Sequence, residues 1–363
     1  MKRLCFLVIC MSIIMGCSTS TSSTKALVDY VDPNIGTAHC RWFFYTPAAI
    51  PFGMAKLAPS TDAHLGNPGG WQAVGYDFRH TSIEGFANFH EFQVGGVVFA
   101  PTVGELQTVP GELENPDGGY RSRFDKKDEV AAPGDYSVLL KDYGVKAELT
   151  AMKRVGFHRY TYPKTELANL IFDIGNKQGE SGEVKDAEVQ YFEDGRVEGY
   201  VITSPVYVNI YQKGADVRMY FSAVLNKKPV QVGTFVKDVV NPGKHQEKGP
   251  GAGLYMTFST EEQEAVEVKV GLSYTSIENA RFNRETEAAD VTFDQAKKNA
   301  TDVWNESLSR IYVEGGKETD KVKFYTGLFH ALLGRGLASD ANGYYPKNNG
   351  TVGRIALDEE GNP

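Results

Sequence analysis

Most of the chain alternates apolar and polar positions with the two-residue period that is typical of β-strands. From Tyr136 to Leu140 every second residue is apolar, a turn follows at 142–144, and the alternation resumes from Val145 to Ala151, which predicts a hairpin. Similar runs follow later: Val206, Val208 and Ile210; Val217, Met219 and Phe221; Val266, Val268, Val270 and Leu272. Many short strands with turn residues between them predict a mainly β fold, a large antiparallel β-sandwich.

The period changes from two residues to a helical spacing near Val291. Thr292 followed by Gln295 is the capping-box pattern that starts a helix. Apolar residues then share one helical face: Phe293, Ala296, Ala300, Val303, Trp304 and Leu308. A second helix is predicted to start near Thr319 or Asp320, with apolar residues three and four apart: Val322, Tyr325, Leu328, Phe329, Leu332 and Leu333. Two helices are too few to form a helical domain that buries its own apolar face. We therefore expect the apolar faces of these helices to be exposed to solvent and their backbone amide hydrogens to exchange readily.

The N-terminus has the pattern of an export signal. Lys2 and Arg3 precede an apolar run from Leu4 to Met15, which is too short to span a bilayer as a stable helix. Gly16 and Cys17 end this run as in a bacterial lipoprotein signal, and a Ser/Thr-rich tether follows. We predict an exported protein of the periplasm or outer membrane that is anchored through lipid on Cys17. An ordinary signal peptide with an incidental cysteine is the alternative.

The cysteines and the charge narrow the class of protein further. The chain has four cysteines, and loss of the signal leaves Cys40 as the single thiol beside the lipidated Cys17, so no disulfide framework is expected. The net charge of -8 and the scattered arginines argue against a nucleic-acid partner. The membrane is expected to be contacted through the lipid anchor alone.

Residues 30–104 combine glycines, prolines, aromatic rings, histidines and amides at high density. Aromatic rings can cover the apolar face of a pyranose, and amides and imidazoles can bind its hydroxyls. His39, Arg41 and Trp42, with the two phenylalanines after them, fit a sugar-facing wall. The alternative is that the rings belong to the core and Arg41 extends to the surface.

Two further groups in this region are candidate sugar contacts. Trp71 follows two glycines and precedes Gln72, which favours a ring projecting into a cleft. His90, Glu91 and Gln93 lie close together in the run FHEFQVGG. A neighbouring His-Glu pair can also be a satisfied polar contact. A metal site would need more ligands at regular spacing, so we predict no metal ligand here.

No catalytic set can be identified from the residues. Hydrolysis of a glycoside uses two carboxyls across the scissile bond. Glutamates and aspartates are plentiful, but none lies in a context that marks an acid of raised pKa or an activating base. A nucleophile-elbow motif and a phosphate-binding loop are also missing from the sequence. The sequence therefore predicts no catalytic residue.

The region 30–104 resembles the N-terminal signature of glycoside hydrolase family 92, the calcium-dependent exo-α-mannosidases. Five later segments resemble that family in the same order: PGDYSV at 133–138, AELTAMKRVGFHRYTYP at 147–163, VGLSYTSIENARFNRETE at 270–287, WNESLSRIYVEG at 304–315 and KFYTGLFHALL at 323–333. The resemblance covers nearly all of the chain after the signal. Trp71 matches the tryptophan that precedes a Gly-Tyr pair in the family.

The resemblance implies a galactose-mutarotase-like β-sandwich packed against an (α/α)6 barrel, with the active site between them. The proton donor, the general base and most calcium ligands of the family belong to the barrel. The implied division is a signal peptide at 1–17, a tether at 18–26, the sandwich at 27–290, a linker helix at 291–312 and the start of an incomplete barrel at 313–363. Calcium is a cofactor of the family, and we expect this fragment alone not to bind it.

The resemblance implies a domain that binds mannose-containing glycans and belongs to an exo-acting, inverting α-mannosidase. The catalytic half lies beyond the residues present, so we leave open whether this chain is an enzyme. The alternatives are a non-catalytic sugar-binding module and an inactive truncated product.

Overall fold

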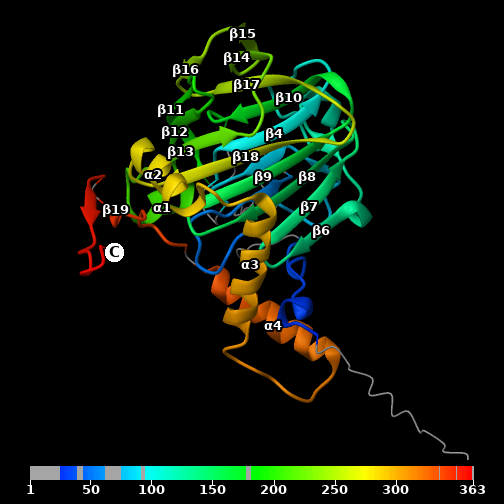
Figure 1. The fold of residues 1–363 in the computed structure, drawn as a ribbon, viewed down its shortest axis with the longest axis vertical. Coiled ribbons are helices and arrows are strands. Elements are labelled where there is room, and N and C mark those ends of the chain that lie inside the picture. The colour runs from blue at the N-terminus through cyan, green and yellow to red at the C-terminus, as the bar shows by residue number, and fades with distance from the viewer. Residues whose placement is uncertain are drawn as a thin grey trace, which may run out of the picture.

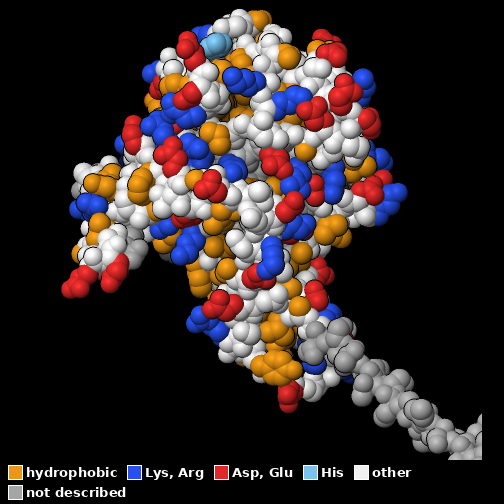
Figure 2. Space-filling view, in the orientation of Figure 1, with side chains coloured by type: hydrophobic (Ala, Val, Ile, Leu, Met, Phe, Trp, Pro, Cys, Tyr) orange, Lys and Arg blue, Asp and Glu red, His pale blue; other side chains and the backbone are white. Residues whose placement is uncertain are grey.

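The computed structural model describes residues 25–38, 44–61, 75–90, 95–176, 181–334, 336–348 and 350–361. Two large antiparallel sheets pack face to face, and two long helices extend from one end of them (Figure 1). The predicted antiparallel β-sandwich is therefore confirmed. On the face shown in Figure 2, acidic and basic side chains are intermixed over the sandwich.

The first sheet has seven strands in the order β1 (Ala58–Ser60), β3 (Gly85–Ala87), β4 (Val98–Val103), β10 (Thr165–Asp173), β17 (Ala252–Thr260), β14 (Gln231–Val236) and β15 (Val239–Pro242). The second has nine, in the order β16 (Gln246–Lys248), β11 (Glu183–Tyr191), β12 (Val197–Ser204), β13 (Val217–Leu225), β18 (Glu264–Ser273), β9 (Val155–Tyr162), β8 (Val145–Ala151), β7 (Asp135–Leu140) and β6 (Glu129–Ala132). Two small pairs are β2 (Ser82–Ile83) with β5 (Ser122–Arg123) and β19 (Tyr344–Pro346) with β20 (Val352–Arg354).

The helices are α1 (Val206–Tyr211), α2 (Ile277–Ala288), α3 (Phe293–Leu308) and α4 (Glu318–Leu333). Three single-turn 3-10 helices complete the described structure: η1 (Leu27–Tyr30), η2 (Pro116–Gly118) and η3 (Lys126–Asp128). No described helix has both the length and the apolar character that crossing a membrane requires.

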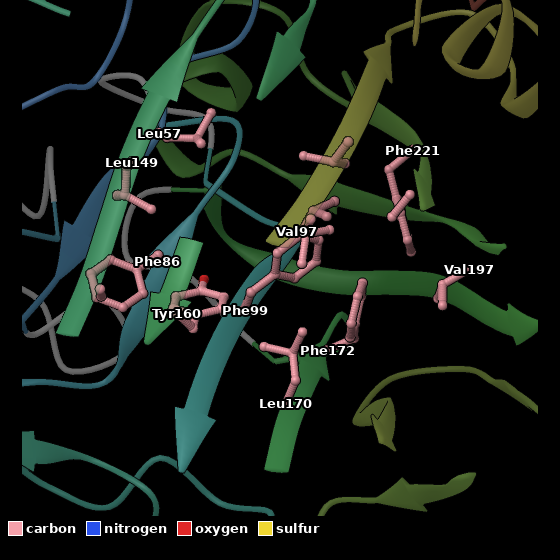
Figure 3. Packing of buried hydrophobic residues seen from close by; sticks show 14 of the residues in the cluster. Leu57, Phe86, Val97, Phe99, Leu149, Tyr160, Leu170, Phe172, Val197 and Phe221 are labelled. Atoms are coloured by element: carbon pink, nitrogen blue, oxygen red, sulfur yellow. The ribbon is translucent and has the colours of Figure 1, made fainter. Parts of the chain in front are cut away.

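The main core lies between the two sheets (Figure 3). Phe172 of β10 packs against Phe99 of β4 with ring centroids 4.1 Å apart, and on the other side it meets Phe221 of β13 at 6.3 Å. Phe86 likewise faces Tyr160 of the opposite sheet. Removal of these rings from water is the main force that holds the sheets together.

The hairpin predicted at 136–151 is confirmed, because β7 and β8 pair with Tyr136 opposite Leu149. The predicted strands around Met219 and Val268 are confirmed as β13 and β18. The strand expected at Val206 to Ile210 is wrong, because this run forms α1. The Asn209 side chain donates to the Pro205 carbonyl at 2.8 Å and accepts from the Gly214 amide at 2.9 Å, so local hydrogen bonds favour a helical turn.

The helix start predicted at Thr292 is confirmed. The Thr292 hydroxyl accepts from the Gln295 amide, and the Gln295 side chain accepts from the Thr292 amide, as in a capping box. The face predicted for this helix is buried except at Val303, which is 36% exposed. The second helix starts at Glu318, beside the predicted position.

The expectation that the apolar faces of these two helices are exposed to solvent is wrong. Tyr325 and Phe329 of α4 are fully buried in a cluster with Trp304 of α3 and Ala49. The N-terminal residues 27–31 pack on the same cluster. The Val28 amide donates to Asn305 Oδ1 at 3.1 Å, and the Asp32 amide donates to Thr326 Oγ1 at 3.0 Å. The helices therefore form a small core with the N-terminal segment and the edge of the sandwich.

Candidate functional site

The candidate site lies where the chain before β1 passes the end of α4. The Lys56 ammonium donates to the Gly334 carbonyl, directly after α4, at 2.8 Å. Lys56 is almost completely buried, so this contact fixes a charged group of the sandwich against the helical part of the chain. The Phe52 amide also donates to the Leu332 carbonyl at 3.1 Å. These contacts join segments that are far apart in the sequence.

His90 is held next to Lys56 by its backbone and by one aromatic ring. Its amide donates to the Lys56 carbonyl at 3.0 Å, and the Tyr45 hydroxyl donates to the His90 carbonyl. The ring of His90 stacks on Tyr45 with centroids 4.4 Å apart and planes inclined by 27°. The imidazole is therefore fixed in one orientation.

Electrostatics keep the His90 ring neutral. Burial, reinforced by the nearby Lys56 ammonium, lowers the pKa of His90 to about 3. Its Nδ1 atom is buried and makes no hydrogen bond with any described residue. A neutral imidazole can donate or accept one more hydrogen bond at that atom. His90 therefore retains unused hydrogen-bonding capacity at neutral pH.

A second histidine, His330 of α4, lies against Phe44, the last ring of the predicted aromatic wall. Its ring stacks on Phe44 with centroids 4.2 Å apart. Gly36 packs on the Phe44 ring so closely that a Cβ there would lie 2.6 Å from a ring carbon. Burial lowers the pKa of His330 to about 4, and Asp32 opposes this shift. Its Nε2 atom is buried and makes no hydrogen bond within the described part of the chain.

Two predicted sugar contacts lie among the described residues: His90 is buried at this junction, and Phe44 of the predicted wall stacks on His330. The other predicted sugar contacts lie outside the described residues: His39, Arg41, Trp42, Trp71, Gln72, Glu91 and Gln93. Cys17, the predicted lipidation site, lies outside them too. Sequence reasoning missed Lys56 and His330. For Lys56, the sequence signal was a lysine inside the apolar run IPFGMAKLAP. For His330, the sequence contains no such signal.

The buried carboxylates of the described residues are engaged in ion pairs or hydrogen bonds. Glu84 lies 3.1 Å from the Arg121 guanidinium, and Glu129 accepts from the Lys126 ammonium at 2.8 Å. Asp173 accepts from the Tyr120 hydroxyl at 2.6 Å. A positive partner or a donor favours the charged carboxylate, which is the opposite of what a general acid needs.

Asp340 is the buried carboxylate that comes nearest to an acid of raised pKa. Burial raises its pKa, while donors from Thr275 and Asn283 oppose the shift. The Thr275 hydroxyl donates to it at 2.5 Å and the Asn283 amide at 2.7 Å. These donors join the end of β18 and α2 to the segment after α4. We assign Asp340 a structural role.

The described residues do not fit a calcium ion. They contain no group of three or more His, Cys, Asp or Glu side chains that could hold a metal. Calcium takes six to eight oxygen ligands, usually with several carboxylates among them. The carboxylate oxygens of Asp340 already accept hydrogen bonds from two neutral side chains, Thr275 and Asn283. Neither of these two partners is a second carboxylate that could share a calcium ion with Asp340.

An open groove of about 770 Å³ runs between the β8–β9 turn, α2 and α3. Its walls are mostly apolar and include Ile50, Met152, Ala300 and Val303. Glu287 in this groove is paired with Arg154 at 2.6 Å. Asp302, the other acid of the groove, is paired with Lys298 at 2.5 Å. The described residues that line the groove thus present no pair of free acids in the arrangement that glycoside hydrolysis needs.

The model of the glycosyl hydrolase family 92 N-terminal domain matches residues 30–273, which is more than half of the chain. The chain belongs to glycosyl hydrolase family 92. The model of the family 92 catalytic domain matches residues 279–359. The family 92 resemblance of the sequence is therefore confirmed. No curated protein matches the chain by sequence.

Solved family 92 structures have the same fold. A family GH92 alpha-mannosidase from Bacteroides thetaiotaomicron is 28% identical with a TM-score of 0.83, and the match covers 92% of this chain and 44% of that one. Its complex with mannoimidazole gives the same identity and TM-score. A family GH92 inverting mannosidase from the same species is 21% identical, with a TM-score of 0.77, and shares the fold over 92% of this chain and 44% of that one. This chain spans less than half the length of these structures.

Proposed function

We propose that this chain is the mannose-binding N-terminal part of an exo-acting α-mannosidase. The observation that carries the proposal is the 28% identity, over 92% of this chain, to a family GH92 alpha-mannosidase. That relative has been seen with mannoimidazole, which supports a terminal mannose of a glycan as the ligand here. The sugar contacts we propose are Trp71 for stacking and His90 for a hydroxyl.

In this proposal, hydrolysis needs residues beyond those of the chain. Inverting hydrolysis uses one carboxylic acid to protonate the leaving oxygen and a carboxylate to activate water on the opposite face. The buried carboxylates Glu84, Glu129 and Asp173 are engaged with arginine, lysine or neutral donors. The rest of the catalytic domain would supply both carboxyls and the calcium ligands. This chain would supply the aromatic and imidazole contacts that orient the sugar.

We expect the purified chain, residues 25–363, to release no mannose from α-mannobiose in the presence of calcium. The physical reason is the lack of two opposed, available carboxyls in its described part. Released mannose, measured by a coupled enzymatic assay, checks this. A complete family 92 α-mannosidase under the same conditions is the positive control. Mannose release by the chain itself would contradict our proposal that the catalytic carboxyls come from the rest of the catalytic domain.

The alternatives are a non-catalytic sugar-binding module and an inactive truncated product. They are favoured by one fact: the chain spans 44% of the relative's length. Titration with methyl α-mannoside separates them. Binding without turnover fits the sandwich half of the enzyme or a separate binding module, and no binding fits the inactive product.

We further propose that the protein is exported and anchored by lipid on Cys17, as its N-terminal sequence indicates. Replacing Cys17 with serine is then expected to abolish incorporation of tritiated palmitate and to release the protein from the membrane fraction. The acyl chains supply the apolar surface that holds the protein to the bilayer. Cys40→Ser is the matched control and should keep the label. Unchanged labelling of Cys17→Ser would contradict the anchor.

A further inference from the structure

The loop 309–317 between α3 and α4, here called the tip loop, lies at the end of the molecule opposite β14 and β15 (Figure 1). It exposes two neighbouring apolar side chains, Ile311 at 48% and Tyr312 at 65%. Phe324 of α4 is also exposed, at 37%. Orange apolar side chains are visible at this end in Figure 2. A group of exposed apolar side chains can mark a surface that contacts a partner or a membrane.

Tyr325 of α4 holds the tip loop and the N-terminal segment at the same end of the molecule. Its hydroxyl donates to the Ile311 carbonyl and accepts from the Val313 amide, both at 3.3 Å. Its ring lies against that of Tyr30, with centroids 5.6 Å apart. The Lys25 ammonium in turn lies 4.2 Å from the ring centroid of Tyr30. Lys25, the first described residue, is therefore a neighbour of the tip loop.

Covalent geometry limits how far the predicted lipid can be from this end of the molecule. Cys17 precedes Lys25 by eight positions in the sequence. A peptide chain spans at most 3.3–3.6 Å per residue, so these eight steps cover no more than about 29 Å. A lipid on Cys17 thus keeps Lys25 within that distance of the bilayer, and the tip loop lies beside Lys25.

The charges around the tip loop nearly cancel. Residues 309–325 contain four cationic and three anionic side chains. Arg310 in this loop lies 3.7 Å from Glu306. A basic patch would be attracted to anionic lipids, but a surface of mixed charge gains little from them. The tip loop therefore fits a contact through apolar side chains at the lipid–water interface, where tyrosine is a common residue.

We propose that the tip loop contacts the phospholipid surface to which the chain is anchored, with Ile311 and Tyr312 at the lipid–water interface. This inference rests on the proposed lipid anchor at Cys17 and adds to it a defined face of the protein. The anchor makes the contact intramolecular, at an effective concentration in the millimolar range, so a weak affinity is enough to keep the loop on the membrane.

The helix α4 connects this contact to the candidate site. It begins at Glu318, beside the tip loop, and ends at Leu333, next to the Gly334 carbonyl that accepts from Lys56. A helix of 16 residues is about 24 Å long. Contact at the tip loop thus places the bilayer at one end of α4 and the candidate sugar site at the other, where glycans outside the membrane can reach it.

The test places a tryptophan at the tip loop and measures its quenching by brominated lipid. Tyr312→Trp keeps an exposed aromatic ring in the loop. Val239→Trp is the matched control, because Val239 of β15 is 59% exposed at the opposite end of the molecule (Figure 1). Both variants of the lipidated full chain are reconstituted into vesicles of brominated phosphatidylcholine, with unbrominated vesicles as the reference. The emission of the three native tryptophans, measured in the unsubstituted chain, is subtracted.

Tyr312→Trp is expected to lose emission on the brominated vesicles, because bromine quenches on contact, whereas Val239→Trp keeps its emission. Adding Ile311→Asp to Tyr312→Trp should restore the emission, since a charged side chain is costly in the membrane. The palmitate label of that double variant should stay unchanged. An equal loss of emission with and without phosphatidylglycerol supports a contact through apolar side chains.

Equal quenching of Tyr312→Trp and Val239→Trp overturns the proposal, and so does quenching that needs phosphatidylglycerol. A concentration-dependent change in the emission of Tyr312→Trp in the unlipidated Cys17→Ser chain, without vesicles, also overturns it, because a second copy would then cover the loop.

Palmitate labelling separates failure of the anchor from failure of the contact. If Cys17 carries no lipid, the anchor proposal fails. The contact is then tested on residues 17–363 with Cys40→Ser, coupled through the Cys17 thiol to a maleimide phospholipid in the same vesicles. Quenching of Tyr312→Trp in that protein supports the tip-loop contact, and its absence overturns it.

Discussion

Replacing Trp304 with alanine is expected to detach α3 and α4 from the sandwich while the two sheets remain folded. Trp304 is fully buried, and its ring packs on Phe329 with centroids 4.6 Å apart. Its indole Nε1 donates to the Ala49 carbonyl at 2.7 Å, which ties α3 to the edge of the sandwich. Truncating a buried tryptophan costs about 3–5 kcal/mol, and it removes the ring on which α3, α4 and residues 27–31 pack.

Hydrogen exchange measured by mass spectrometry checks this prediction region by region. Peptides from α3 and α4 should lose protection in Trp304→Ala, and peptides from the central strands β10 and β17 should keep it. Val303→Ala is the control on the neighbouring position, because that side chain is 36% exposed and its loss should cost little. Loss of protection throughout the sandwich would show instead that the helices and sheets unfold as one unit.

The sheets were largely predictable because one physical pattern dominates them. In the hairpin of β7 and β8, alternate side chains face the core, so the alternation of residues 136–151 directly reports the structure. The start of α3 was predictable for a similar reason, since Thr292 and Gln295 satisfy each other locally. Both signals depend on residues that are close in sequence.

The pattern failed where a helix buries small residues. The helix α2 presents Ala280, Asn283 and Ala288 to the sheet and has no stripe of large apolar side chains. It lies so close to β18 that a Cβ on Gly271 would be 2.1 Å from the Ala280 carbonyl oxygen. Close approach of backbones needs small side chains, and these give no amphipathic signal. This helix was therefore missed.

The candidate site was predictable only in part, because its contacts join distant parts of the chain. Lys56 reaches Gly334 across 278 positions, and the pairing of Phe44 with His330 is comparably remote. A single sequence shows that a lysine lies in an apolar run, but not which carbonyl accepts from it. The sequence indicated that His90 makes a polar contact. Its burial and its uncharged state depend on neighbours such as Lys56, which only the fold brings close to it.

Replacing Glu84 with alanine is expected to destabilise the sandwich by about 3–5 kcal/mol, the usual cost of leaving a buried charge without its partner. Glu84 and Arg121 are both almost completely buried, and the guanidinium lies 3.1 Å from the carboxylate. The Ser60 hydroxyl also donates to Glu84, at 2.9 Å, and Arg121 donates to the Thr61 carbonyl. Urea unfolding followed by circular dichroism measures the loss.

The double variant Glu84→Leu with Arg121→Met separates the ion pair from its packing. Removing both charges and keeping the volume leaves no uncompensated ion, so most of the stability lost in Glu84→Ala should return. The return should be incomplete, because Thr61 and Ser60 would lose their partners in the pair. If the double variant is as unstable as Glu84→Ala, shape or hydrogen bonding at this position matters more than charge.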